Sequence, residues 1–414
     1  MKLYTLRSFV VGILLVVLGG VIGFQLGTGK NVPGVTRVLQ AIPQFSRVIN
    51  VKVPQDKSNV DFSQFWVVWQ RLEGSYLDPQ KLNAKKMVYG AIQGMVASLG
   101  DPYTLYLPPE DQKRNTESLQ GSFDGVGIEL GYKNQALSVV APIKDHPAAK
   151  AGIRAGDFIL HIKDEQKKID KDTSGITLPE AVDLIRGVKG TKVTLTILHE
   201  GGKPEAIDLI RDTIVVPSVE LKFVDKGNKK VAEITLSQFG DRTDTEWNTA
   251  VDQIVAQKKN LAGVVLDLRN NPGGYLQEAI NIGSEFISSG VIVTQQGKNE
   301  SQSYTVNRQG RLIDIPVVVL VNKGSASASE IVAGALRDRR GVKVVGENSF
   351  GKGTVQDAQN DLPGGAGLHI TIARWLLPSG NWIHEKGLAP DVQVTDDLDT
   401  KDVDEALQKA VETL

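Results

Sequence analysis

Apolar positions along the second half of the chain follow two alternating periods. Short runs rich in β-branched and other apolar residues predict strands at 230–236, 263–269, 292–295, 316–321 and 342–346. Spacing typical of amphipathic helices predicts helices at 243–259, 275–288 and 328–339. Because strands and helices alternate, we expect an α/β domain over 213–394 whose sheet is at least partly parallel.

The first residues of the chain have the pattern of a membrane segment. Residues 8–29 carry no charge, and Lys2 and Arg7 precede them. A helix of this length rises about 1.5 Å per residue and spans the roughly 30 Å hydrocarbon layer. No Ala-x-Ala cleavage motif is present, so residues 1–29 are predicted to be a retained signal anchor and transmembrane helix. Residues 30–57 lack clear periodicity and are predicted to be a linker.

Residues 58–116 and the end of the chain have helical patterns of their own. Apolar residues recur at helical spacing over 60–72 and 87–99, with a break at Asp78-Pro79, so two helices are predicted. The aromatic residues of the first helix are interpreted as its packed face. Residues 395–414 are acidic and then helical, and we expect this tail to take part in self-association.

Composition narrows the class of protein. The 414 residues exceed one ordinary domain. With 47 basic and 48 acidic residues the formal net charge is −1, so no broad electrostatic field favours nucleic acid. The absence of cysteine excludes a disulfide scaffold, a catalytic thiol and thiolate zinc sites. No metal or other cofactor is predicted.

The stretch from 322 to 356 carries the clearest chemistry. A cluster of small residues with three serines precedes a predicted helix, and Lys352 follows between Gly351 and Gly353. A serine hydroxyl is a weak nucleophile at neutral pH, and a buried lysine with a lowered pKa can act as its base. The two glycines allow a tight turn that brings the amine close. The pattern therefore indicates a serine/lysine pair.

Three other interpretations of this stretch stay open on the residues alone. Ser327 and Glu330 fit the S-x-x-E capping box of a helix. Residues 346–353 match a phosphate loop, except that Gly353 stands where Ser or Thr must hold magnesium. A Ser-His-Asp triad would need one of the five histidines, which are His146, His161, His199, His369 and His384.

A glycine turn supplies a third element. The predicted strand 263–269 runs into Asn270-Asn271-Pro272-Gly273-Gly274, a turn that can expose backbone amides. Acyl transfer needs N–H donors aimed at the developing oxyanion, typically the amide after the nucleophile and one from a glycine-rich loop. Here these are the amides of Ala328 and of Gly273 or Gly274. The alternative is an ordinary strand-to-helix turn.

Motifs spread from about residue 60 to about 394 resemble the carboxyl-terminal processing peptidases, also called tail-specific proteases. They are GMVASLGDPYTLYLPPED at 94–111, GSFDGVGIEL at 121–130, HPAAKAGIRAGDFILHI at 146–162, LIRGVKGTKV at 184–193, LDLRNNPGG at 266–274, NKGSASASE at 322–330, FGKGTVQ at 350–356 and GLAPDV at 387–392.

The resemblance implies a role for each site residue. Ser327 is the nucleophile, Lys352 the general base and Gln356 the residue that orients the lysine, with Gly273 and Ala328 as the oxyanion hole. The residues alone do not choose Ser327 over its neighbouring serines. Four residues along a strand span about 13 Å, so a direct contact between Lys352 and Gln356 needs a bend in the chain.

Residues 117–212 resemble a PDZ domain of the protease-associated kind. The amides of Gly125, Val126, Gly127 and Ile128 suit capture of a C-terminal carboxylate, with the substrate tail added as a strand along 127–131. Arg186 is interpreted as a contact between this module and the protease body, or as a partner of the incoming carboxylate.

The predicted protein is multidomain, with an α/β protease core, an inserted PDZ-like β domain, an N-terminal helical segment and an N-terminal transmembrane helix. We expect a serine endopeptidase anchored in the cell membrane by a single span, with its catalytic part outside the cytoplasm. We expect its partners to be proteins with exposed C-terminal tails, and a homo-oligomer is a further hypothesis that the sequence does not decide. Two other classes remain, a catalytically silent PDZ scaffold and a nucleotide-dependent enzyme.

Overall fold

A computed structural model describes residues 60–395 and 403–414, which fall into two units, 1–84 and 85–414. The predicted anchor 1–29 and linker 30–57 lie outside the described residues. In the first unit, helix α3 (Ser63–Ser75) is followed by the 3-10 turn η2 (Pro79–Lys81), so the predicted break at Asp78-Pro79 is confirmed. The residues described include no helix with the length and apolar content that a membrane crossing requires.

The aromatic face predicted for α3 is not buried. None of the residues of α3 is buried within the described part of the chain, and its rings contact one another instead. Phe65 lies edge-on to Trp66, with ring centroids 5.0 Å apart. Phe65 and Trp66 each also lie 6.0 Å from Trp69, so rings three and four positions apart on this helix contact one another. Packing of this face against other residues stays a prediction.

The second unit begins with α4 (Ala84–Ala97), β1 (Leu105–Leu107) and α5 (Pro109–Gln120). Helix α5 has Pro109 at its first position and ends at Gly121, whose φ of 61° is the left-handed cap that glycine favours. Strand β1 pairs with β18 (Ala366–Leu376), a strand more than 250 positions later in the chain. This pairing places the turn before β1 against the part of the unit that contains β18.

The predicted PDZ-like region forms its own β domain with its own apolar core. A five-stranded antiparallel path runs β3-β4-β5-β7-β8, β6 pairs with β5, and β2 pairs with β9. The elements are β2 (Ser122–Gly125), β3 (Ile128–Lys133), β4 (Ala136–Pro142), α6 (Pro147–Lys150), β5 (Phe158–Asp164), β6 (Ile169–Asp172), α7 (Leu178–Ile185), β7 (Lys192–Leu198), β8 (Glu205–Ile210) and β9 (Asp212–Val215).

A buried ion pair joins the parts of this domain. Arg211 Nη2 lies 2.7 Å from Asp164 Oδ2, and both side chains are at most 1% exposed. Arg211 also donates to the Ile185 carbonyl at the end of α7 and to Thr191 Oγ1 before β7. One guanidinium therefore satisfies polar groups from three segments that would otherwise be buried without partners.

The α/β prediction for the core is confirmed. A six-stranded sheet has the order β10-β11-β12-β15-β16-β19, in which only the β10–β11 pair is antiparallel. Its elements are β10 (Val219–Lys226), β11 (Lys229–Leu236), α8 (Thr243–Ala256), η3 (Lys258–Asn260), β12 (Leu261–Asp267), α9 (Leu276–Phe286), β15 (Val317–Val321), α10 (Ala328–Arg340), β16 (Lys343–Gly346), β19 (Val392–Gln393) and α11 (Glu405–Thr413).

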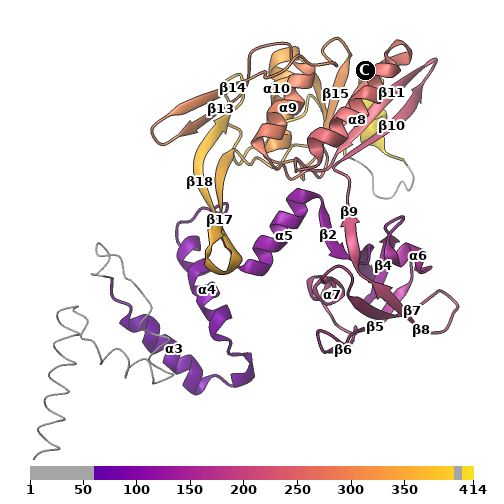
Figure 1. Cartoon of the computed structure of the whole chain (residues 1–414). Coiled ribbons are helices and arrows are strands. Elements are labelled where there is room, and N and C mark those ends of the chain that lie inside the picture. The colour runs from indigo at the N-terminus through magenta and orange to yellow at the C-terminus, as the bar shows by residue number, and fades with distance from the viewer. Residues whose placement is uncertain (1–59, 396–402) are drawn as a thin grey trace, which may run out of the picture. The chain divides into compact units, whose positions relative to one another are not determined.

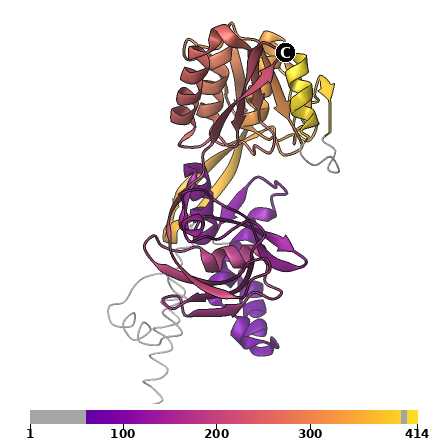
Figure 2. The ribbon, with the colours of Figure 1, turned by 90° about the vertical axis from the view of Figure 1, so that its right-hand side faces the viewer.

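Alternate residues of the central strands fill two cores. In β12, Val264 and Leu266 pack with α8, α9 and α10, whereas Val265 packs with Ala406 and Ala410 of α11. The three crossover helices and the C-terminal helix accordingly lie on opposite faces of the sheet (Figure 2). The tail was predicted to be helical, and its apolar face is used within the chain. Self-association through it stays a prediction.

A second sheet carries the loop that contains Lys352. Its strands are β1, β13 (Val291–Gly297), β14 (Ser301–Thr305), β17 (Thr354–Leu362) and β18. Strands β17 and β18 form a long hairpin (Figure 1), with the 3-10 turn η4 (Pro363–Gly365) at its tip. The apolar pattern did not predict this hairpin, because β17 consists mainly of polar residues that stay exposed or half-buried.

We predict that Arg211→Ala destabilises the PDZ-like domain by about 3–5 kcal/mol, because it leaves the Asp164 carboxylate buried without its partner. Amide hydrogen exchange in β5 and β7, with thermal unfolding of the whole chain, measures the effect. Lys192→Ala is the matched control, since its ion pair with Asp208 is exposed, and it should change exchange little. Equal exchange in the two variants would contradict a stabilising role for the buried pair.

Candidate active site

The predicted nucleophile and the glycine turn meet at one edge of the six-stranded sheet. Strands β12 and β15 are parallel neighbours, so the loops that follow them leave the sheet side by side. The Ala326 amide donates to the Asn271 carbonyl at 2.9 Å, and the Asn270 amide donates to Asn322 Oδ1 at 2.8 Å. These bonds join the loop after β12 to the loop that ends in Ser327.

The backbone of Ser327 is strained. Its φ of 56° and ψ of −114° are rare for a residue with a side chain, and α10 begins at the next residue. A strand, a sharp turn at a serine and a helix are the arrangement that exposes a nucleophilic hydroxyl. Ser325 and Ser329 are fully buried and their hydroxyls bond to backbone carbonyls. The structure thus distinguishes Ser327, which lines a cavity, from the other two serines.

Gly273 fits closely against this turn. Its φ is 98°, and a Cβ there would lie 2.8 Å from Ser327 Cβ and 3.0 Å from the Ala328 nitrogen. Only glycine is compatible with this approach. The Ala328 amide lies at the first position of α10, whereas the Gly273 amide donates to Asn271 Oδ1 at 2.8 Å. The two amides are adjacent, and their role as an oxyanion hole stays a prediction.

Glu330 connects the serine turn to the lysine loop. Its carboxylate is fully buried and accepts from the Ser327 amide at 2.7 Å, the Gly351 amide at 2.7 Å, the Lys352 amide at 3.0 Å and Ser349 Oγ at 2.5 Å. Burial raises the pKa of Glu330, and these hydrogen bonds oppose that rise. The capping box predicted the bond to Ser327, but no pattern in the sequence predicted the bonds to residues 349–352.

The loop geometry excludes the phosphate-loop interpretation. The Gly351 and Lys352 amides, which would face a phosphate, are taken by Glu330. The chain after Lys352 continues into strand β17 and not into a helix. Anion binding by such a loop needs free amides at a helix N-terminus, and both requirements are missing here.

The Lys352 side chain lies in a largely buried environment. Burial lowers the pKa of Lys352, and the negative charges of Asp101 and Glu330 partly oppose this. Its Nζ lies 5.3 Å from the centroid of the Tyr103 ring. The Trp375 indole N–H donates to the Lys352 carbonyl at 3.0 Å and fixes the backbone. A lowered lysine pKa is the property that the serine/lysine prediction requires.

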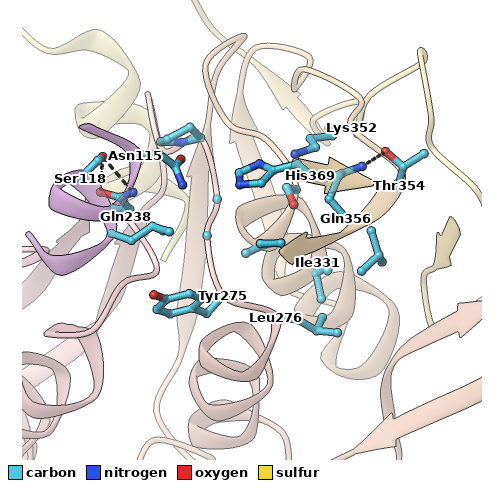
Figure 3. Close-up of a pocket in the computed structure, with 18 of the residues that line it drawn as sticks. Asn115, Ser118, Gln238, Tyr275, Leu276, Ile331, Lys352, Thr354, Gln356 and His369 are labelled. Carbon is cyan, nitrogen blue, oxygen red and sulfur yellow. Dashed lines mark hydrogen bonds between the residues drawn. The ribbon is translucent and has the colours of Figure 1, made fainter. Parts of the chain in front are cut away.

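Gln356 lies near the lysine but bonds elsewhere. A register shift between Val355 and Gln356 bends β17 at this point. The Gln356 Nε2 donates to Thr354 Oγ1 at 2.9 Å (Figure 3). It also donates to Thr371 Oγ1 at 3.1 Å. The structure thus brings Gln356 to the same cavity as Lys352, and its amide is held by two threonines.

A cavity of about 500 Å³ contains these residues. Asn115 and Ser118 of α5 lie on one side, and Lys352, Gln356 and His369 lie on the other (Figure 3). Polar groups of α5 therefore face the β17–β18 hairpin across the opening. In the described part of the chain, no group of three or more histidine, aspartate and glutamate side chains is placed to hold a metal ion.

His369, one of the five histidines considered for a triad, lines this cavity. Its Nε2 is buried without a hydrogen-bond partner, and burial together with the charge of Lys352 lowers its pKa. His384 accepts from the Gly353 amide, and His199 bonds to Asp157 in the PDZ-like domain. Among the described residues no histidine is hydrogen bonded to Ser327, so the triad interpretation finds no support.

The predicted tail-binding residues lie apart from the cavity. Gly125 ends β2, Ile128 begins β3, and Gly127 between them has a φ of 75°. A Cβ on Gly127 would lie 2.6 Å from His146 Cβ, so this position accepts only glycine without rearrangement. Arg186, after α7, extends to α5 and forms an ion pair with Glu117 at 3.3 Å. Its guanidinium lies 3.9 Å above the Phe123 ring.

Family models match three parts of the chain. Peptidase family S41 matches residues 230–394, a PDZ domain matches 138–198, and the N-terminal domain of the activating protease CtpB matches 39–111. The carboxy-terminal processing protease CtpA of Bacillus subtilis is 38% identical over 333 residues, which cover 80% of this chain and 68% of that protein. The carboxy-terminal-processing protease of Bartonella bacilliformis is 41% identical and covers 82% and 76%.

Fold comparison agrees with these matches. A solved Bacteroides fragilis structure named for family S41 superposes with a TM-score of 0.56 at 16% identity, covering 83% of this chain and 95% of that one. At this identity the likeness concerns the fold alone. The probable CtpA-like serine protease of Staphylococcus epidermidis is 39% identical, and this chain spans 64% of its length.

We predict that Glu330→Gln loosens the lysine loop, because the introduced NH₂ meets N–H donors where a carboxylate oxygen accepted. Amide exchange at Gly351 and Lys352 should accelerate at least about tenfold, with a loss of about 1–3 kcal/mol of stability. Glu347→Gln is the control, since that carboxylate bonds to the exposed Lys323. Unchanged protection of the loop in Glu330→Gln would show that other contacts hold it.

Proposed function

The chain belongs to the carboxyl-terminal processing peptidases, S41-type serine proteases with a PDZ domain, and we propose that its catalysis runs through Ser327 and Lys352. The observation that carries the proposal is the strained turn at Ser327, joined through Glu330 to the loop of Lys352. The lowered pKa of Lys352, caused by burial, increases the fraction of neutral amine near neutral pH.

In the proposed reaction the neutral Lys352 amine accepts the Ser327 hydroxyl proton while Oγ attacks the peptide carbonyl. The Ala328 and Gly273 amides then receive the oxyanion, which requires the Gly273 N–H to leave Asn271 Oδ1 or to be shared with it. The Lys352 ammonium returns its proton to the leaving nitrogen, and the peptide bond breaks to give an acyl-enzyme. Water deprotonated by the same amine releases the acyl group and restores Ser327.

We propose that the PDZ domain selects the substrate by its tail. The amides around Gly125–Ile128 would bind the terminal carboxylate, and the tail would add as a strand beside β3. Arg186 would couple the domain to the protease, since it pairs with Glu117 of α5 and the same helix carries Asn115 and Ser118 at the cavity. The substrates are therefore proteins with an exposed C-terminal tail.

We also propose that residues 1–29 anchor the protein in the cell membrane with the catalytic part outside the cytoplasm. The proposal rests on the uncharged stretch 8–29. Membrane fractionation of the chain with and without residues 1–29 tests it, and equal recovery in the soluble fraction would contradict it.

Ser327→Ala and Lys352→Ala should each lower kcat/KM for an unfolded protein substrate by at least about 10³-fold while the circular dichroism stays unchanged. Lys352→Arg should be equally inactive, because a guanidinium keeps its proton. Ser325→Ala and Ser329→Ala are the controls, and they should retain much more activity although they lose buried hydrogen bonds. Cleavage by Ser327→Ala within tenfold of wild type would assign the nucleophile elsewhere. Absence of cleavage by the wild type itself would favour a role as a scaffold.

Amidating the C-terminus of a long substrate should lower its rate of cleavage at least about tenfold, because the charge that the PDZ amides bind is removed. Gly127→Val should have the same effect through its clash with His146, provided that hydrogen exchange shows the domain still folded. Short peptides that reach Ser327 unaided are the control and should be cut as before. Equal cleavage of free and amidated substrates would mean that the PDZ domain does not receive the tail.

A further inference from the structure

The turn that precedes β1 covers the amine of Lys352. Tyr103 lies in this turn, and its ring centroid is 5.3 Å from Lys352 Nζ. Two residues earlier, Asp101 accepts from the Tyr103 amide at 3.0 Å and from Thr104 Oγ1 at 2.7 Å. The turn is therefore folded around one carboxylate, and the negative charge of that carboxylate acts on the proposed general base.

The same carboxylate is connected to Gln356. The Thr371 amide of β18 donates to Thr104 Oγ1 at 3.0 Å, and Thr104 Oγ1 in turn donates to the Asp101 carboxylate. The Thr371 hydroxyl also helps to hold the pKa of Asp101 below its ordinary value. Thr371 Oγ1 in turn accepts from Gln356 Nε2 at 3.1 Å. Gln356 thus reaches the surroundings of Lys352 through Thr371 and Asp101, although its own amide bonds to threonines.

We propose that Asp101 is a positioning residue of this protease, which holds Lys352 for proton transfer and stabilises the ammonium formed when Ser327 gives up its proton. The proposal rests on the proposed role of Lys352 as the base. Gln356 would act on the lysine indirectly, through Thr371 and Asp101. A direct hydrogen bond between Gln356 and the lysine amine is then not required.

The charges around the amine support this assignment. Burial raises the pKa of Asp101, but hydrogen bonds from Thr371, Thr104 and the Tyr103 amide outweigh it and keep the pKa below its ordinary value. Asp101 is thus an anion at neutral pH. The other titratable groups near Lys352 or its turn are Tyr103, Glu330, His369, His384 and Glu385.

Two carboxylates act on Lys352, and Asp101 is the one that can adjust its position when the lysine becomes protonated. Glu330 is committed to three backbone amides and a serine, which it must hold in every state of the reaction. The Asp101 carboxylate is half-buried, and its side-chain hydrogen-bond donor is the rotatable hydroxyl of Thr104. It can therefore strengthen its interaction with the lysine as the ammonium forms without releasing a backbone segment.

The test is Asp101→Asn, a change that keeps the shape and removes the charge. Because the carboxylate favours the protonated lysine, its loss should lower the pKa of Lys352 and move the acidic limb of kcat/KM to lower pH by about one unit. Activity on the alkaline plateau should nevertheless fall about tenfold, since the ammonium formed in the transition state loses its counter-charge. A residue that only held the turn would lower activity without moving the limb.

Asp361→Asn, on the exposed part of β17, is the matched control and should leave both limb and plateau unchanged. His369→Asn separates the titration of that histidine, because a limb that persists in this variant does not belong to His369. A wild-type limb in folded Asp101→Asn overturns the proposal. If Lys352→Ala is also inactive in that case, the serine/lysine mechanism stands without Asp101, whereas an active Lys352→Ala refutes the mechanism itself.

If amide exchange at 101–106 shows that Asp101→Asn unfolds the turn, variants of Thr371 test the proposal instead. Thr371→Val breaks the connection between Gln356 and Asp101 and should lower kcat at least about tenfold with KM for short peptides unchanged, and Thr371→Ser should restore it. Loss in Thr371→Val and Gln356→Ala should not add, because both act along one path. Wild-type activity in Thr371→Val would overturn the proposal.

Discussion

The active-site geometry depends on one buried carboxylate, that of Glu330. It accepts hydrogen bonds from the amide of Ser327 at the head of α10 and from the amides of Gly351 and Lys352 in the loop before β17. A strained backbone such as that of Ser327 costs about 1–3 kcal/mol and persists only where its surroundings determine it. The Glu330 carboxylate helps to hold this strained conformation of Ser327. The same two oxygen atoms also fix the distance between the serine turn and the lysine loop.

Loops from two sheets bond to this carboxylate, and each sheet positions a different part of the site. The parallel sheet brings the loops after β12 and β15 to one edge, which places Gly273 against Ser327. The antiparallel hairpin β17–β18 carries Lys352, Gln356 and Thr371 and faces α5 across the cavity. The site therefore lies between a rigid core and an exposed hairpin, where polar residues stay accessible to a peptide and the lysine amine is largely desolvated.

The electrostatics of the lysine are a balance of burial against charge. Burial lowers the pKa of Lys352 and so favours the neutral amine that a base requires, while Asp101 and Glu330 favour the ammonium that the reaction produces. A base with no nearby anion would be neutral but would take up a proton reluctantly. Asp101 belongs to the turn before β1, which β18 holds, so the N-terminal part of the unit takes part in the proposed catalytic centre.

The sequence by itself determined the α/β alternation, the serine and lysine with their flanking glycines, and the helix that begins at Ala328, because these depend on local periodicity and on residues close together in the chain. It did not predict the β17–β18 hairpin, whose strands are polar, nor the bonds from Glu330 to residues 349–352. Local sequence patterns did not distinguish Ser327 from Ser325 and Ser329. The folded structure does, because Ser325 and Ser329 are buried whereas Ser327 lines the cavity. The connection of Asp101 to Thr371 joins residues 270 positions apart, and only the folded chain could bring them together, since local patterns contain no information about strand pairing over such a separation.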